Sequence, residues 1–199
     1  MNAKKKAVEE ALRYAEANGW RVADKMKTYE FELKFSLPRS SQNPDDFVER
    51  LAETGCTDAL VGIGQTGRVA FHFTRDAHSA LEAVLSAVNN VKTAIPEATL
   101  IEAAPDLVGL SDIAEILGYS RQNIRKLMIN NMVSFPAPIH EGKTALWHLS
   151  SILTWVKESN RYQIDELLLD IANINMQLNI AKESVHMDAT IQKQIAAGI

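Results

Sequence analysis

The sequence is poor in the residues and runs that mark several classes of protein. It has a single cysteine, Cys56, which excludes a disulfide within the chain and fits a reducing cytoplasm. No apolar run approaches the ~20 residues that span a bilayer. The lysine-rich start, Lys4 to Lys6, lacks the apolar core of a secretory signal. We therefore expect a cytoplasmic protein with no membrane segment.

Residues that carry catalytic or metal chemistry are present but not grouped. The histidines and Cys56 show no metal-ligand spacing, and no Ser/His/Asp set or carboxylate pair converges on an apparent cleft. The run from Gly62 to Gly67 matches G-x-G-x-x-G, but a predicted strand follows it where a dinucleotide site requires a helix. The sequence therefore predicts a glycine-rich hairpin there, and neither an enzyme, a metal site nor a cofactor.

Charge is distributed unevenly along the chain. With 46% hydrophobic and 23% charged residues the composition is that of a globular protein, and the net charge is −4. Residues 118–145 nevertheless carry four cationic side chains against Glu141 alone, a local charge of +3. An acidic body with one basic face suits a protein that binds selected DNA sites without coating DNA indiscriminately.

Residues 26–105 are predicted to form an α+β domain. Apolar and polar residues alternate from Tyr29 to Leu37, which is typical of a half-buried strand. A short helix follows the Asn43-Pro44 cap, and Asp76 is predicted to cap a long helix. Three further strands are expected at 59–63, 68–74 and 99–103. The order βαββαβ predicts a ferredoxin-like domain, a four-stranded antiparallel sheet with two helices on one face.

Residues 1–25 precede this domain and are lysine-rich at their start. Their apolar spacing predicts a helix that ends near Asn18-Gly19. We interpret the segment as a helical N-terminal appendage. The alternative is a functional basic arm.

Residues 106–159 are predicted to form a winged helix-turn-helix. Ser111 is expected to cap a first helix, Gly118 to provide a left-handed turn, and Ser120 to cap a second helix held to the core by Ile124 and Leu127. Glutamine and asparagine can bind the edge of adenine, and arginine that of guanine. The candidate DNA-binding residues are Tyr119, Ser120, Arg121, Gln122, Asn123, Arg125 and Lys126. The alternative is a helical hairpin with a solvated polar face.

A hairpin is predicted after the second helix. Phe135 to Pro138 is expected to be extended, since each proline disfavours helix in the residue before it. A tight turn with positive φ at Gly142 and a strand through Thr144 follow, and then a helix capped by Ser150 or Ser151. Contacts to the DNA backbone or minor groove are assigned to His140, Lys143 and Thr144. The alternative is a hairpin that only connects the helices.

These motifs resemble a known family. The run from Leu107 to Gly118, Ser120 to Asn123, Phe135 to Pro138, and the tryptophans Trp147 and Trp155 resemble the winged helix-turn-helix of the MerR/excisionase superfamily, including AlpA-like prophage regulators. The resemblance covers about fifty residues. It implies a dimer that binds an inverted repeat, with the second helix in the major groove and the wing beside it. Metal sensing is not implied, because the cysteine cluster of such sensors is missing.

The flanking segments also resemble known bacterial proteins. Residues 29–103, followed by the predicted winged helix-turn-helix, are similar to small DNA-binding regulators whose genes lie beside small toxin genes. Ala11 to Glu16 with Gly19-Trp20 is similar to the opening of HicA-like toxins, but the part containing the catalytic histidine of such a toxin has no counterpart here. The resemblance therefore implies an antitoxin-like autorepressor and no toxin activity.

Residues 160–199 are predicted to form a long C-terminal helix with a tail. Its apolar positions alternate by three and four residues, as in a coiled-coil seam. The seam consists of Ile164, Leu167, Ile171, Ile174, Leu178, Ala181 and Val185. We expect it to form a homodimer, because a two-fold DNA reader needs half-sites about 34 Å apart or a multiple of it. The alternative is a helix packed against its own domain.

Taken together, these patterns predict a homodimeric, sequence-specific transcriptional regulator, and an autorepressor in particular. Its partners are double-stranded DNA and a second copy of the chain. Two alternatives stay open: an antitoxin whose main role is to bind a small toxin protein, and an excisionase-like factor that bends DNA.

Overall fold

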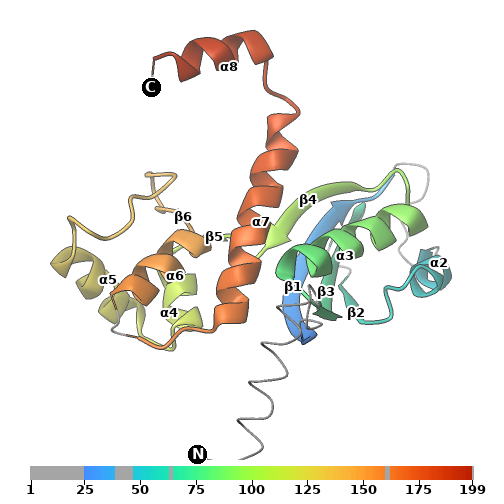
Figure 1. Cartoon of the computed structure of the whole chain (residues 1–199), viewed down its shortest axis with the longest axis horizontal. Coiled ribbons are helices and arrows are strands. Elements are labelled where there is room, and N and C mark those ends of the chain that lie inside the picture. The colour runs from blue at the N-terminus through green and yellow to red at the C-terminus, as the bar shows by residue number, and fades with distance from the viewer. Residues whose placement is uncertain (1–24, 39–46, 63–64, 160–161, 199) are drawn as a thin grey trace, which may run out of the picture.

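The computed structural model of the protein describes residues 25–38, 47–62, 65–159 and 162–198. Within these ranges the fold is α+β, with a four-stranded sheet and seven helices. Figure 1 shows the sheet at one end of the molecule, a group of shorter helices at the other end, and α7 between them. The predicted appendage, the Asn43-Pro44 cap and the centre of the glycine-rich run lie outside the described residues.

The four-stranded sheet is antiparallel and has the order β2-β3-β1-β4. Its strands are β1 (Lys27–Ser36), β2 (Ala59–Gly62), β3 (Arg68–Ala77) and β4 (Thr99–Ala104). Alternate residues of β1 are buried, as the sequence predicts for a half-buried strand. Phe31 of β1 is paired with Phe73 of β3, and their rings stack at 5.3 Å. His72 is exposed on the opposite side from Phe71 and Phe73, as the alternation predicts.

Two helices accompany the sheet. Helix α2 (Val48–Glu53) buries Leu51, and α3 (Ala80–Ala94) buries a small apolar face that includes Val84 and Val91. The predicted cap of α3 is wrong. Asp76 belongs to β3, because β1–β3 pairing continues to Lys27↔Ala77, and the helix begins after Ser79, whose Oγ accepts a hydrogen bond from the Glu82 N–H.

A second hydrophobic core lies in the helical unit. This unit contains β5 (Leu107–Val108), α4 (Leu110–Ile116), α5 (Arg121–Asn130), β6 (Trp147–His148) and α6 (Leu149–Glu158). Strands β5 and β6 pair antiparallel. The core gathers Ile113, Ile124, Trp147, Leu149 and Ile152, all nearly inaccessible to solvent.

Helix α7 (Glu166–Ser184) completes both cores. Ile171 lies in the core of the sheet unit, with Leu167, Ile174 and Leu178 packed against it. Ala172 lies in the core of the helical unit, with Ile164 packed against it. Only Ala181 and Val185, of the predicted dimerisation seam, are exposed. This corrects the preferred interpretation of the heptad pattern, because most of the apolar stripe is already covered by the chain's own two units.

Polar contacts fix α7 to the junction between the units. The Asn179 side chain accepts a hydrogen bond from the Ala103 N–H at 2.9 Å, and its amide nitrogen lies 2.8 Å from both the Ala103 carbonyl oxygen and Asp106 Oδ2. Lys182 Nζ donates to the carbonyl of Ile101. Asn175, which is fully buried, donates to the carbonyl of Pro105 at 3.3 Å. The outer edge of β4 is therefore bonded by side chains of α7.

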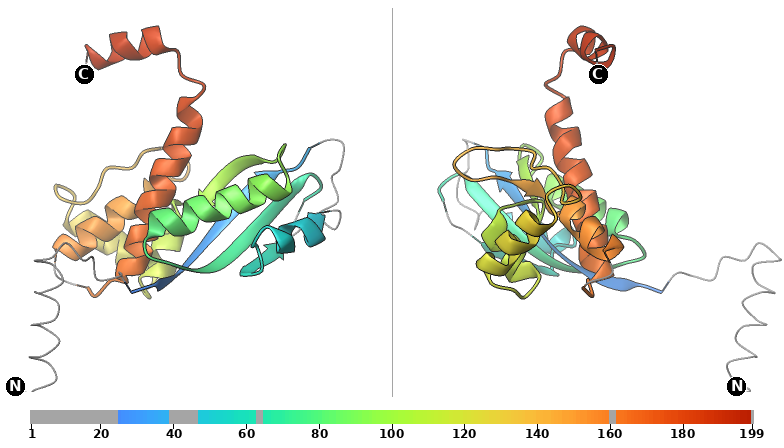
Figure 2. Two further views of the ribbon diagram at one scale, coloured as in Figure 1. Left: turned by 45° about the vertical axis from the view of Figure 1, so that its right-hand side comes forward. Right: turned by 90° about the vertical axis from the view of Figure 1, so that its left-hand side faces the viewer.

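Helix α8 (Ala189–Ala196) follows α7 and differs from every other helix described, because it buries none of its residues. Figure 2 shows it standing clear of both units in two further views. None of the helices in the described ranges combines the length and apolarity needed to cross a membrane.

Candidate functional site

The turn between α4 and α5 has the conformation that the sequence predicts. Gly118 has φ +71°, and the amide of Tyr119 donates to the Ala114 carbonyl at 2.7 Å. A Cβ added at Gly118 would meet no atom within 4 Å. Glycine is therefore favoured here by the left-handed backbone and not by crowding.

The first helix of this pair begins earlier than predicted. Gly109 is the N-cap of α4, and its amide donates to the Asp112 carboxylate at 2.7 Å. Ser111 lies inside the helix and does not cap it. The reason is that β5 carries the extended chain to Val108, so that Leu110 starts the helix and packs against the core of the helical unit.

The start of α5 confirms the predicted cap. Ser120 Oγ accepts a hydrogen bond from the Asn123 N–H at 3.2 Å. One apolar position, Ile124, is 2% exposed, and Met128 packs against the same core. The serine fixes where the helix begins and Ile124 fixes its rotation, so these two residues decide which side chains point outward.

The outward side of α5 carries the predicted binding residues. Arg121, Gln122, Asn123, Arg125 and Lys126 are all exposed. Within the described part of the chain, none of these five side chains takes part in an ion pair or a side-chain hydrogen bond. Their donors and acceptors are therefore available to a partner, and three of the five side chains are cationic.

Tyr119 has a partner that the sequence analysis missed. The residue is 42% exposed, and its ring lies 5.1 Å from the ring of Tyr162, edge to face. Tyr162 packs against the core of the helical unit. The contact orients Tyr119 beside the start of α5. No local pattern signals it, because the two tyrosines are far apart in the sequence.

The predicted hairpin forms a short ladder. The Ile139 N–H donates to the Leu146 carbonyl at 2.8 Å, and the Leu146 N–H donates to the His140 carbonyl at 3.0 Å. His140, Lys143 and Thr144 are exposed around its tip, as the prediction requires. Figure 1 shows the loop and α5 at the same end of the molecule, away from the sheet.

Two details of the hairpin differ from the prediction. Gly142 is not among the described glycines with positive φ; instead, a Cβ there would lie 2.8 Å from Nε2 of His140. The returning strand β6 contains Trp147 and His148 but not Thr144. A larger residue at position 142 would require the exposed His140 ring to shift.

Aromatic residues hold the base of the hairpin. The ring of Phe135 lies 6.1 Å from that of Trp147 and 5.1 Å from that of Trp155, both edge to face. The Trp147 indole N–H donates to the Pro136 carbonyl at 2.9 Å. Because these contacts join the extended segment to β6 and α6, the loop is carried on a packed base.

The predicted serine cap of α6 is wrong. The N-cap is His148, and Ser150 lies inside the helix with its hydroxyl 3.2 Å from Met176 Sδ. His148 Nδ1 lies 2.7 Å from Oδ1 of the buried Asp106. His148 and Ser150, at the start of α6, therefore contact the junction between the units and α7 and do not cap the helix with their side chains.

Comparisons with known proteins identify no relative. No family model, curated protein or solved structure matches the chain. In the described ranges, no three His, Cys, Asp or Glu side chains are grouped so that they could hold a metal ion. The candidate site is therefore the outward side of α5 with the nearby hairpin, which together form a surface of exposed hydrogen-bonding and cationic groups.

Proposed function

We propose that the protein is a sequence-specific DNA-binding transcriptional regulator of the cytoplasm. The sheet order β2-β3-β1-β4 with α2 and α3 supports a ferredoxin-like domain. The succession of α4, α5, a hairpin and α6 supports a winged helix-turn-helix, with α5 as its recognition helix.

The observation that carries the proposal is the set of unpaired polar side chains on α5. The amides of Gln122 and Asn123 can each form two hydrogen bonds with adenine, and Arg125 can do so with guanine. Arg121 and Lys126 supply charge for phosphates, which positions the helix without specifying sequence. An exposed surface of this composition, on a helix whose rotation is fixed by Ile124, is what reading a major groove requires.

The hairpin supports the same function. Lys143 and Thr144 are exposed at its tip, and His140 lies in its ladder. A cation and a hydroxyl at this place can contact the phosphate backbone or the minor groove beside the recognition helix. The regulator would act as a dimer on an inverted repeat, since one α5 covers only one half-site. Repression of its own gene is the simplest role for such a protein.

Selection of DNA from a random pool by the full-length protein tests the proposal. We expect enrichment of one sequence, followed by a loss of about 1–3 kcal/mol in binding free energy for Gln122→Ala and for Arg125→Ala, measured by fluorescence anisotropy. Arg68→Ala is the matched control, because Arg68 is an exposed arginine on β3 of the other unit. Circular dichroism checks that each variant is folded. A pool without enrichment, or unchanged affinity in both α5 variants, would contradict the proposal.

A further inference from the structure

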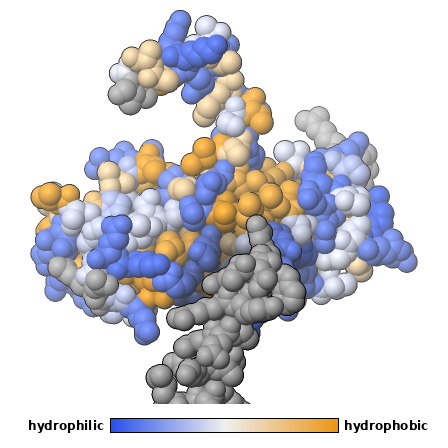
Figure 3. Space-filling model, in the orientation of Figure 1, coloured by the Kyte–Doolittle hydropathy of each residue, from blue (hydrophilic) through white to orange (hydrophobic). Residues whose placement is uncertain are grey.

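Helices α3 and α7 share an apolar face that the described residues leave partly open. Leu81 and Leu85, one turn apart on α3, are 50% and 43% exposed. Ile174 and Leu178 of the adjoining α7 pack against the sheet core but are only partly buried. Figure 3 shows the resulting hydrophobic area where the start of α3 lies beside α7. Exposed apolar side chains that adjoin one another on a folded surface indicate a contact with a further element or partner.

The described chain begins at the rim of this apolar face. Lys27, the first residue of β1, lines a hollow of about 260 Å³ together with Leu81 and Ile174. Met26, immediately before it, is 53% exposed. Residues 1–24 therefore join the fold next to the apolar face, and their covalent attachment keeps their local concentration there high.

The sequence of residues 1–24 contains an apolar side of matching kind. Its predicted helix has one apolar stripe, which consists of Val8, Ala11, Leu12 and Ala15. Val8 and Leu12 are four residues apart, the same spacing as the exposed leucines of α3. Rows of side chains at this spacing interdigitate where two helices pack. A helix this short is marginal in water by itself, so it needs a surface on which to bury the stripe.

The connection between this predicted helix and β1 is long enough to reach the whole face. The helix is predicted to end near Asn18-Gly19, and residues 19–26 span up to roughly 26–29 Å when extended. Helix α3 has 15 residues, which corresponds to about 22 Å. Every part of the apolar face is therefore within reach of the predicted helix.

Trp20 lies within this connection and suits the hollow beside Lys27. An indole ring combines a large apolar body with one N–H donor, which usually finds an acceptor when the ring is buried. The hollow has apolar walls at Leu81 and Ile174 and an acceptor at Asp170. The Asp170 carboxylate has no ion pair or hydrogen bond within the described chain. The mixed lining of the hollow thus matches the two parts of the indole.

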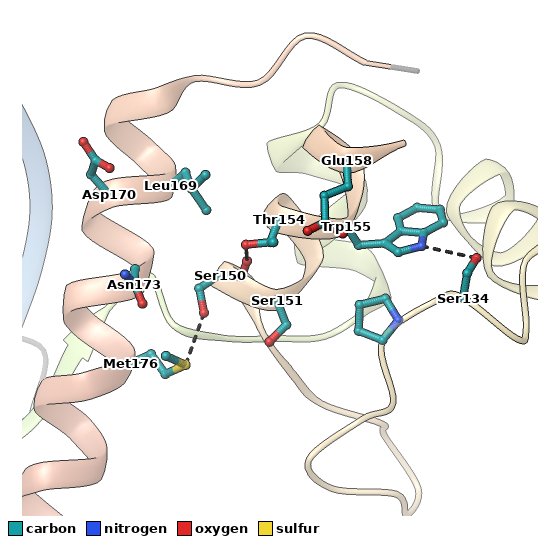
Figure 4. Close-up of a pocket in the computed structure, with 11 residues that line it drawn as sticks. Ser134, Ser150, Ser151, Thr154, Trp155, Glu158, Leu169, Asp170, Asn173 and Met176 are labelled. Carbon is teal, nitrogen blue, oxygen red and sulfur yellow. Dashed lines mark hydrogen bonds between the residues drawn. The ribbon is translucent and has the colours of Figure 1, made fainter. Parts of the chain in front are cut away.

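The hollow between α6 and α7 is more polar by contrast. Figure 4 shows polar side chains of both helices around it, among them Ser151, Thr154 and Glu158 of α6 and Asp170 and Asn173 of α7. An apolar stripe gains little by packing on such a lining. We therefore expect the stripe of the predicted helix to lie against α3.

We propose that residues 1–24 cover the apolar face of α3 and α7 in their own chain. The apolar stripe of the predicted helix packs against Leu81 and Leu85, and Trp20 occupies the hollow beside Lys27. The contact makes the N-terminal segment a part of the sheet unit. It requires neither DNA nor a second copy, so it is independent of the proposed function.

Limited digestion of the full-length protein with trypsin tests the contact. Residues 1–24 contain cleavage sites at Arg13 and Arg21, which docking should protect. Replacing both Leu81 and Leu85 by aspartate should speed cleavage there by roughly tenfold or more, because the burial of two leucines is lost and cleavage follows the population of the open form. Leu60→Asp, at a 75% exposed leucine on β2, is the matched control and should leave the rate unchanged. Circular dichroism checks that each variant is folded.

A substitution within the segment tests the same contact without altering the described fold. Leu12→Asp should speed cleavage after Arg21 by a similar factor. Ala17→Asp introduces the same charge on the opposite side of the predicted helix and should have little effect. Cleavage that is equally fast in the wild-type protein and in every variant would overturn the proposal and leave the face to a separate partner.

A disulfide cross-link tests whether the contact lies within one chain. The native cysteine is removed by Cys56→Ala, and Leu12→Cys is combined with Leu85→Cys. We expect a cross-linked monomer, seen by non-reducing electrophoresis, that forms faster than with Leu12→Cys and Leu60→Cys. If two proteins with one cysteine each formed a linked dimer at the same rate, the face would belong to a second copy and the proposal would be wrong. A protected segment in a protein that selects no DNA sequence would contradict the proposed function alone.

Discussion

The sheet unit and the helical unit use their charged side chains differently. On the sheet, Lys34 Nζ lies 2.8 Å from Glu102 and 3.2 Å from Glu32, and the hydrogen bond to Glu102 raises the pKa of Lys34. Arg75, 7% exposed, is bonded to Asp58 and to the carbonyl of Gly55. The cations of α5 have no such partners in the described chain. The two units therefore differ in whether their cationic side chains are paired within the described chain.

The two cores also differ in size and composition. The sheet unit packs aromatic rings in register across its central strands, as at Phe31 and Phe73, and closes them with α3. The helical unit has a smaller core, and three of its aromatic residues hold the hairpin. Both cores share α7. The units are thus distinct in chemistry but joined by one helix.

The largest effect is expected from Phe73→Ala in the sheet core. Phe73 is fully buried, so its removal should lower the free energy of unfolding by about 3–5 kcal/mol. Denaturant unfolding followed by far-UV circular dichroism reports the whole chain. In a Trp20→Phe background the remaining tryptophans are Trp147 and Trp155, and their fluorescence reports the helical unit. Because α7 belongs to both cores, we expect both signals to shift together. A shift in dichroism with unchanged tryptophan fluorescence would show that the units unfold independently.

A smaller effect is expected from Asn179→Ala at the junction. The change removes the bonding partner of the Ala103 backbone and a donor to Asp106, which should cost roughly 1–3 kcal/mol. Asn173→Ala is the matched control on the exposed side of α7 and should change stability by less than about 0.5 kcal/mol. Hydrogen exchange at the Ala103 amide should accelerate in the first variant only. Equal effects in the two variants would show that the hydrogen bonds of Asn179 do not stabilise the junction.

The smallest effect is expected from Gly118→Ala in the turn before α5. Alanine has room there, so the cost is that of positive φ, about 1–2 kcal/mol. Gly118→Asn should cost less, because asparagine enters the left-handed region more readily. Thermal unfolding measures both. If alanine and asparagine were equally tolerated, the turn would not require a left-handed residue.

Local sequence patterns predicted the individual strands, turns and helix caps better than they predicted which distant residues pair with them. The alternation in β1, the left-handed Gly118 and the Ser120 cap depend on neighbouring residues, and all three are confirmed. The caps assigned to Asp76 and Ser111 are wrong. The pairing of β3 with β1 extends past Asp76, whereas the pairing of β5 with β6 ends shortly before Ser111. Sequence spacing shows that a backbone can turn at a residue but not how far a distant strand will pair.

The heptad pattern of α7 illustrates the same limit. Its spacing correctly identifies an apolar side, but two units of one chain and a second chain offer chemically similar surfaces. The structure covers Ile171 with the chain's own core, and Ile180 and Val185, near the end of the helix, are exposed. The sequence does indicate that Arg75 is buried, because it follows Phe71 and Phe73 at every second position and so faces the same side of β3. This alternation does not identify Asp58 as its partner.

The place of α7 in the chain has a consequence for synthesis. Both units precede α7 in the sequence, yet each core is completed by its side chains. A ribosome therefore releases the sheet and the short helices while their shared apolar surfaces are still uncovered. Folding to the final state must wait until α7 has emerged, and during that interval the nascent chain exposes surfaces to which chaperones can bind.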